Sequence, residues 1–207
     1  AFVGLANDIV KAALEGNFAN VEDLKAANLN GKTVDENVKE LIAKIGENMN
    51  VRRFKKVTAA DGFVSTYIHL GGKIGVIVEA KGDVANEAVA KDVAMHIAAL
   101  SPKFMKRDEV TTETLDKEKE IAREQLIKEG KPADKVEMIL NGKMRKFYEE
   151  NCLLEQAFVK DPEKSITTYI KGKIEIVSFD RFGLGEGIAK EEVDFAEEVR
   201  KTVEASK

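Results

Sequence analysis

The segment 112–153 constrains the fold most strongly, because it predicts two helices joined by one sharp break. Its first half is mostly charged, and the few apolar side chains available for burial recur at helical spacing: Leu115, Ile121, Ala122, Leu126 and Ile127. Gly130-Lys131-Pro132 then ends one helix and begins the next, since glycine terminates helices and proline is favoured at their first position. Narrow apolar seams are typical of two-stranded coiled coils, whereas a helix packed in a globule shows a wider apolar face. We therefore predict an antiparallel helical hairpin that projects from the body of the protein.

The first 50 residues predict three helices. Apolar residues recur with a helical period over 2–13, 21–27 and 34–45. Thr33 and Glu36 have the spacing of a capping box, in which each side chain accepts a hydrogen bond from the backbone of the other residue. The third helix should therefore begin directly after Thr33.

The composition then changes to that of β-strands. Runs rich in β-branched and aromatic residues predict four strands, at 51–57, 63–70, 74–80 and 174–182. Gly71 and Gly72 separate the second strand from the third, and glycine adopts the positive φ of a tight hairpin at little cost, so we predict a two-residue turn there. Further helices are predicted at 89–100, from Pro162 to about residue 170, and at 191–203.

These elements predict an α+β protein in which small antiparallel sheets pack with helices and a helical hairpin protrudes. The expected domains are a helical remainder of an N-terminal core subdomain, a core subdomain with an antiparallel sheet, the inserted hairpin, and a C-terminal helical module. Their boundaries are 1–50 for the first, 51–111 together with 154–187 for the second, 112–153 for the third and 188–207 for the last.

Composition excludes several classes of protein. The 33 Lys and Arg residues nearly balance the 37 Asp and Glu residues, and the resulting net charge of −4 gives no strong field for nucleic acid or an anionic membrane. The single cysteine, Cys152, cannot form an internal disulfide, which favours the reducing cytoplasm. No apolar run approaches the roughly 20 residues that a membrane-spanning helix needs.

The residues that could carry chemistry are few. One cysteine and two histidines on different elements make a zinc site improbable, and no other metal or cofactor site is expected. His96 flanks the apolar stripe of its helix and is interpreted as a histidine bonded to backbone or solvent. His69 ends a strand beside the glycine turn, where a partner can reach it. The glycine-rich loop from Gly183 to Gly187 lacks the end of a phosphate loop and is interpreted as a connection. An interaction protein without catalytic residues is what remains.

Several segments resemble one protein family. Residues 44–53, with Ile-Gly-Glu-Asn followed by two arginines, are similar to a signature of elongation factor Ts. Residues 67–76, 94–102 and 181–187 resemble that family in the same order. The resemblance covers nearly the whole chain. It implies a guanine-nucleotide exchange factor that binds elongation factor Tu with GDP, loosens magnesium and nucleotide, and lets GTP replace GDP.

The resemblance also implies where the partner binds. Ile45 and His69 match residues that the family uses against the C-terminal domain of elongation factor Tu, and Val159 lies in a corresponding contact segment. Gly71 and Gly72 belong to the same presented turn as His69. Segment 112–153 matches the coiled-coil protrusion of the family. A homodimer is left open.

One element of the family is not found in the sequence. The loop Thr-Asp-Phe-Val, which acts near the magnesium site of the partner, should lie just before a helix like that at 2–13, where this chain begins. We therefore expect a truncated factor that binds the partner. The alternatives are an enzyme built around His69 and the loop from Gly183 to Gly187, and an RNA-associated translation protein.

Overall fold

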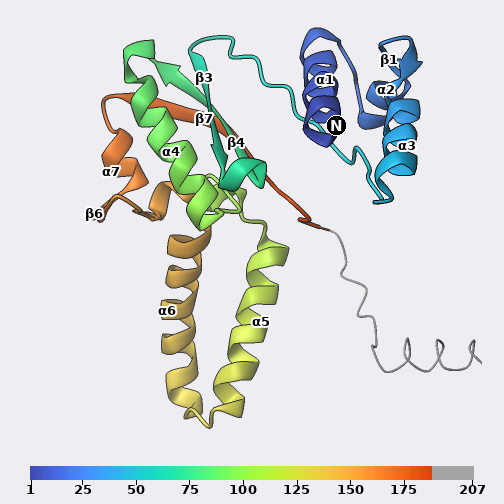
Figure 1. Ribbon diagram of the computed structural model, residues 1–207. Coiled ribbons are helices and arrows are strands. Elements are labelled where there is room, and N and C mark those ends of the chain that lie inside the picture. The colour runs from blue at the N-terminus through green and yellow to red at the C-terminus, as the bar shows by residue number, and fades with distance from the viewer. Residues whose placement is uncertain (188–207) are drawn as a thin grey trace, which may run out of the picture. The chain divides into compact units, whose positions relative to one another are not determined.

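The computed structural model describes residues 1–187 and divides the chain into two units, residues 1–64 and the part from Ser65 on (Figure 1). The predicted helix at 191–203 lies outside the described residues. The finer division into four parts stays a prediction. The elements of the first unit are three helices and a short antiparallel hairpin: α1 (Phe2–Glu15), α2 (Val21–Ala26), β1 (Asn28–Leu29), β2 (Lys32–Thr33) and α3 (Val34–Ile45).

The capping box predicted for α3 is present. The side chain of Thr33 accepts a hydrogen bond from the backbone of Glu36, and the carboxylate of Glu36 accepts one from the backbone of Thr33 at 2.7 Å. Gly46 ends the helix in the left-handed conformation. All three predicted helices of the first 50 residues are therefore confirmed, and their apolar faces meet in one core: Ile9, Ala13, Leu24, Val34 and Val38.

The strand predicted at 51–57 is wrong. This segment forms no strand in the structure; instead Val51 and Phe54 pack against the core of the first unit. The ammonium group of Lys56 donates hydrogen bonds to the carbonyl oxygens of Leu14 and Gly16, at 2.5 and 2.9 Å. Leu14 lies in the last turn of α1, whose carbonyls lack helical partners, and Gly16 is the residue that ends the helix. Segment 51–57 therefore covers part of the core of the first unit and caps the C-terminus of α1.

The second unit is built on a three-stranded sheet in the order β3-β4-β7, formed by β3 (Phe63–His69), β4 (Ile74–Gly82) and β7 (Ile174–Gly183). Strands β4 and β7 are antiparallel along their whole length, with Ile74 opposite Gly183 and Gly82 opposite Ile174. Gly82 is required at its end of the sheet, since a Cβ there would lie 2.8 Å from the carbonyl oxygen of Lys173.

Helix α4 (Glu87–Leu100) lies along one face of this sheet (Figure 1). The inward side chains of α4 and of β4 are buried together: Val76, Val78, Ala80, Ala90, Val93, Ala94 and Ile97. A second small hairpin, β5 (Ala157–Phe158) with β6 (Asp161–Ser165), leads into α7 (Ile166–Ile170). The sheet and α4 thus form the body that holds the turns described below.

Helix α7 begins later than its sequence suggested. Pro162 lies in strand β6, and the hydroxyl of Ser165 caps the helix by accepting from the backbone of Thr168 at 3.2 Å. Proline fixes φ at a value that suits an extended strand as well as a first helical turn, so tertiary pairing decided between them.

The predicted helical hairpin is present as α5 (Thr112–Lys128) and α6 (Ala133–Asn151), and it projects from the body of the second unit (Figure 1). Its interior is as narrow as the sequence indicated, with Ala122, Leu140 and Met144 buried between the helices. Arg123 on α5 pairs with Glu137 on α6 at 2.5 Å. None of the helices within residues 1–187 combines the length and the hydrophobicity that a membrane-spanning helix needs.

Candidate functional site

The connection between β3 and β4 contains a three-residue 3₁₀ turn, Leu70–Gly72, followed by Lys73, instead of the predicted two-residue turn. Leu70, Gly71 and Gly72 all have positive φ, at 50°, 64° and 96°. A Cβ on either glycine would meet nothing within 4 Å, so the backbone conformation alone requires glycine. The predicted partner-binding residues Gly71 and Gly72 therefore shape the turn.

His69 is the last residue of β3 and is half-buried beside this turn. Its Nδ1 lies 3.1 Å from the hydroxyl oxygen of Tyr67, and the two rings stack with centroids 5.7 Å apart. Alternation along the strand places both side chains on one face. Tyr67 therefore holds the imidazole in one orientation at the end of the sheet.

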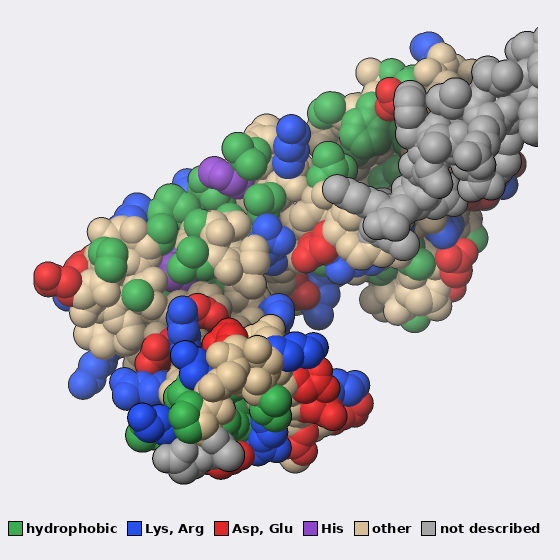
Figure 2. Space-filling model, turned by 90° about the horizontal axis from the view of Figure 1, so that it is seen from below, with side chains coloured by type: hydrophobic (Ala, Val, Ile, Leu, Met, Phe, Trp, Pro, Cys, Tyr) green, Lys and Arg blue, Asp and Glu red, His purple; other side chains and the backbone are tan. Residues whose placement is uncertain are grey.

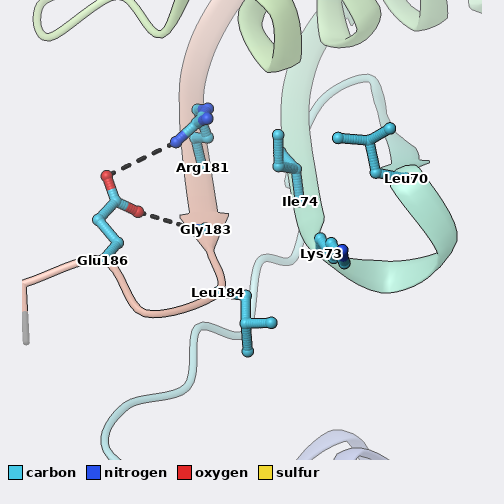
Figure 3. Close-up of a pocket in the computed structure, with 7 residues that line it drawn as sticks. All are labelled: Leu70, Lys73, Ile74, Arg181, Gly183, Leu184 and Glu186. Carbon is cyan, nitrogen blue, oxygen red and sulfur yellow. Dashed lines mark hydrogen bonds and ion pairs between the residues drawn. The ribbon is translucent and has the colours of Figure 1, made fainter.

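Exposed apolar side chains surround the turn. Ile68 and Leu70 are more than half exposed, and Leu184 on the adjoining loop is 77% exposed. Figure 3 shows an open pocket here. Its lining comes from the turn, from β7 and from the loop after β7: Leu70, Lys73, Ile74, Arg181, Gly183, Leu184 and Glu186. The loop is fastened to the turn by a hydrogen bond from the backbone of Leu184 to the carbonyl oxygen of Lys73, at 2.8 Å.

The loop after β7 is organised around Glu186. Its carboxylate accepts a hydrogen bond from the backbone of Gly183 at 2.9 Å and lies 3.6 Å from the guanidinium of Arg181 (Figure 3). His69 does not line this pocket. This pocket therefore does not combine His69 with the loop from Gly183 to Gly187, as the alternative of an enzyme built around both would require.

Val159 lies in the turn between β5 and β6 and is 43% exposed. Its backbone N–H donates to Nδ1 of His96 at 3.2 Å, and its neighbour Phe158 is buried against Tyr169, with ring centroids 4.1 Å apart. The interpretation of His96 as a histidine bonded to backbone is confirmed. The backbone group is the N–H of Val159, a candidate site residue.

Asp92 holds the other side of the same turn. One carboxylate oxygen accepts from Lys160 and the other from the hydroxyl of Tyr169, both at 2.6 Å. Burial raises the pKa of Asp92, but these two hydrogen bonds outweigh it and bring the pKa below the ordinary value. Burial and the same carboxylate raise the pKa of Tyr169 to about 12. Sequence reasoning missed this cluster; its one local signal is the spacing of Asp92 and His96, four residues apart on one helix.

Ile45 belongs to the first unit, where it is the last residue of α3 and 40% exposed. The other four predicted residues belong to the second unit. Each unit therefore presents its own candidate contact.

The remaining candidate residues are structural or lack partners for chemistry. Cys152 is fully buried, and burial raises its pKa to about 11, so it fills space in the core as an unreactive thiol. Among the described residues, no group of three or more His, Cys, Asp or Glu side chains is placed to hold a metal ion. On the face shown in Figure 2, acidic and basic side chains are interspersed, which fits the weak field expected from the net charge.

Comparison with known proteins gives a consistent result. A family model described as "Elongation factor TS" matches residues 1–186. An elongation factor Ts of Clostridium kluyveri is 44% identical over 98% of this chain and 71% of its own length, and one of Clostridium botulinum is 45% identical over 100% and 71%. An elongation factor Ts of Halothermothrix orenii is 50% identical over 83% of this chain and 58% of its own length.

The match covers nine-tenths of the chain, and the identities to these relatives are far above those of chance similarity. The chain therefore belongs to the elongation factor Ts family, whose members are cytoplasmic nucleotide-exchange factors for elongation factor Tu in translation elongation and are not enzymes.

Proposed function

We propose that this chain docks on elongation factor Tu through the turn from His69 to Gly72 and the turn at Val159 in the second unit, and through Ile45 in the first. The observation that carries the proposal is the Val159 turn. There an apolar side chain stays 43% exposed, although hydrogen bonds hold its backbone and the following lysine. Binding to a rigidly held side chain loses little conformational entropy, so such a residue is suited to an interface.

The turn at His69 supports the same proposal. A half-buried histidine, oriented by Tyr67, stands next to the exposed side chains of Ile68 and Leu70. Interfaces combine a few anchoring side chains with a surrounding rim that excludes water. The mixture of one positioned polar ring and several exposed apolar groups fits that description.

Docking produces exchange only through unequal affinity. A protein that binds the nucleotide-free partner more tightly than the GDP-bound partner must weaken GDP binding by the same factor. The chain therefore needs no catalytic group to promote GDP release; it needs contacts that strengthen when the nucleotide leaves.

The test compares two valines of nearly equal exposure. Val159→Ala should weaken binding to elongation factor Tu by about 1 kcal/mol or more, because truncation of an interface side chain has that cost. Val177→Ala is the matched control, since Val177 is 41% exposed on β7, outside the proposed contacts. Isothermal titration calorimetry with nucleotide-free elongation factor Tu measures both. Equal affinities for the two variants would reject Val159 as a contact.

A homodimer is a separate proposal, supported by an exposed apolar stripe on α1. Val3, Val10 and Leu14 lie on one side of this helix, and each is about two-thirds exposed. Light scattering of the purified chain at micromolar concentration tests it. A mass twice that of the 22.8 kDa chain supports a dimer, and the mass of a single chain at every concentration rejects it.

A further inference from the structure

We infer that His96 and Gln156 form a buried positioning pair that sets the Val159 turn for docking on elongation factor Tu. The inference rests on the proposed function, because it takes Val159 as a contact with the partner. It assigns a role to two residues that do not themselves reach the surface.

The hydrogen bonds determine which ring nitrogen of His96 carries the proton. Because the backbone N–H of Val159 donates to Nδ1 at 3.2 Å, Nδ1 must be the unprotonated nitrogen. Nε2 then carries the proton and donates to Oε1 of Gln156 at 2.9 Å. The amide nitrogen of Gln156 donates in turn to the carbonyl oxygen of Glu150 at 2.7 Å. The hydrogen bonds therefore all run in one direction: Val159 donates to His96, His96 donates to Gln156, and Gln156 donates to the last turn of α6.

Neither member of the pair can act by touching the partner. His96 is 0% exposed and Gln156 is 2% exposed. Burial lowers the pKa of His96, which keeps the ring neutral and so preserves the acceptor at Nδ1. Any influence of these residues on docking must therefore be indirect, and the hydrogen bond from the backbone of Val159 links His96 to the exposed turn.

The same helix secures the residues on both sides of Val159. Asp92, one helical turn before His96, binds the ammonium group of Lys160 and the hydroxyl of Tyr169. The ring of Tyr169 stacks on Phe158. Three successive residues, 158–160, are thus fastened by separate contacts, and the valine side chain between them remains exposed.

The contact from His96 restrains the backbone of Val159 itself. The direction of a side chain at a turn follows from its own φ and ψ, and the N–H that donates to Nδ1 of His96 belongs to that backbone. A turn that is already in its bound geometry avoids an ordering cost on association. Removal of the acceptor should therefore reduce affinity even when the fold persists.

Two conservative variants separate positioning from general support of the fold. In His96→Asn, the amide oxygen lies near the place of Nδ1, so it can still accept from Val159 but no longer reaches Gln156. In His96→Gln, the longer amide reaches the place of Nε2 and can donate to Gln156, but leaves Val159 without its acceptor. Each variant loses one of the two hydrogen bonds, so a purely structural role would affect both alike.

The experiment uses the full chain and two measurements. Amide hydrogen exchange of Val159, followed by NMR in the free chain, should stay slow in His96→Asn and become faster in His96→Gln. Calorimetric affinity for nucleotide-free elongation factor Tu should fall roughly tenfold in His96→Gln, the loss of one well-placed interface side chain, and less than about twofold in His96→Asn. Thermal melts confirm that both variants are folded.

Three results would overturn the inference. Equal exchange of the Val159 amide in the two variants would show that His96 does not hold it. Equal loss of affinity in the two variants would show that the pair only supports the fold, and unchanged affinity in both would show that the geometry of the turn does not matter for docking. If the unaltered chain does not bind elongation factor Tu at all, the proposed function fails and the docking role fails with it. The exchange measurement in the free chain distinguishes that case, since it still reports whether the pair holds the turn.

Discussion

At the scale of single residues, the two histidines of this chain lie in different environments, so we expect their substitution to have different consequences. His69 is half-buried at the end of a strand, with one hydrogen bond to Tyr67. His69→Ala should weaken binding to elongation factor Tu by about 2 kcal/mol but lower the free energy of unfolding by only about 0.5 kcal/mol. Calorimetry and thermal melts measure the two effects.

Tyr67→Phe is the matched variant for His69, because it keeps the stacked ring and removes only the hydroxyl. Its affinity should fall less than that of His69→Ala. If His69→Ala binds elongation factor Tu as tightly as the unaltered chain, then His69 is not a contact residue.

His96 predicts a dependence of stability on pH. Burial holds the pKa of His96 below the ordinary value of 6.5, so near pH 6 the unfolded chain binds more protons than the folded one. The contribution of the neutral ring to stability is complete above pH 6.5 and is lost as the pH falls below that value towards the folded pKa. Urea midpoints at pH 7.5 and pH 5.5 should therefore show a loss of stability that is smaller in His96→Gln. An identical loss in that variant would assign the effect to other groups.

At the scale of elements, the projecting hairpin of α5 and α6 is expected to be separable from the body. Its buried residues Ala122, Leu140 and Met144 form a cluster of their own. The contacts at its base involve residues before 115 or after 146: Phe104 pairs with Cys152, Arg107 binds Glu155 with two hydrogen bonds at 2.5 Å, and Gln156 binds the carbonyl oxygen of Glu150. Removal of the hairpin therefore leaves the base of the body largely intact.

A variant in which residues 115–146 are replaced by four glycine or serine residues tests this separation. Such a linker spans roughly 13 Å when extended, enough to join two helices that pack about 10 Å apart. Circular dichroism should show less helix, and urea should still unfold the remainder in a single cooperative transition. A broad, non-cooperative transition would mean that the body depends on the hairpin for its fold.

At the scale of the whole molecule, docking and exchange are expected to separate in a polypeptide of residues 1–207. Ile45, His69 and Val159 are present, whereas the sequence contains no Thr-Asp-Phe-Val, the loop that the resemblance assigns to the magnesium site of the partner. Contacts that bind the GDP-bound and empty partner equally cannot change nucleotide affinity, however tight they are. Stopped-flow release of fluorescent GDP should therefore run near its spontaneous rate, although pull-down shows a complex. Acceleration by several orders of magnitude would show that residues 1–207 suffice for exchange.

Features with local causes can be predicted from the amino-acid sequence. The capping box of Thr33 and Glu36 begins α3, and Gly130 with Pro132 separates the two helices of the projecting hairpin, because caps and breaks involve residues only a few positions apart. The narrow seam of that hairpin followed from periodicity alone. The strands β3, β4 and β7, and with them the α+β class, follow from local runs rich in β-branched and aromatic residues.

Features that depend on residues far apart in the chain became visible only in the folded structure. Segment 51–57 has the composition of a strand, but a strand needs a neighbour to satisfy its backbone, and here the segment packs on the first unit and caps α1 through Lys56. The Val159 turn is held by His96, 63 residues away in the chain, and Lys160 by Asp92, 68 residues away. No local pattern contains such pairs, because hydrogen bonds between distant residues form only after packing has brought the elements together.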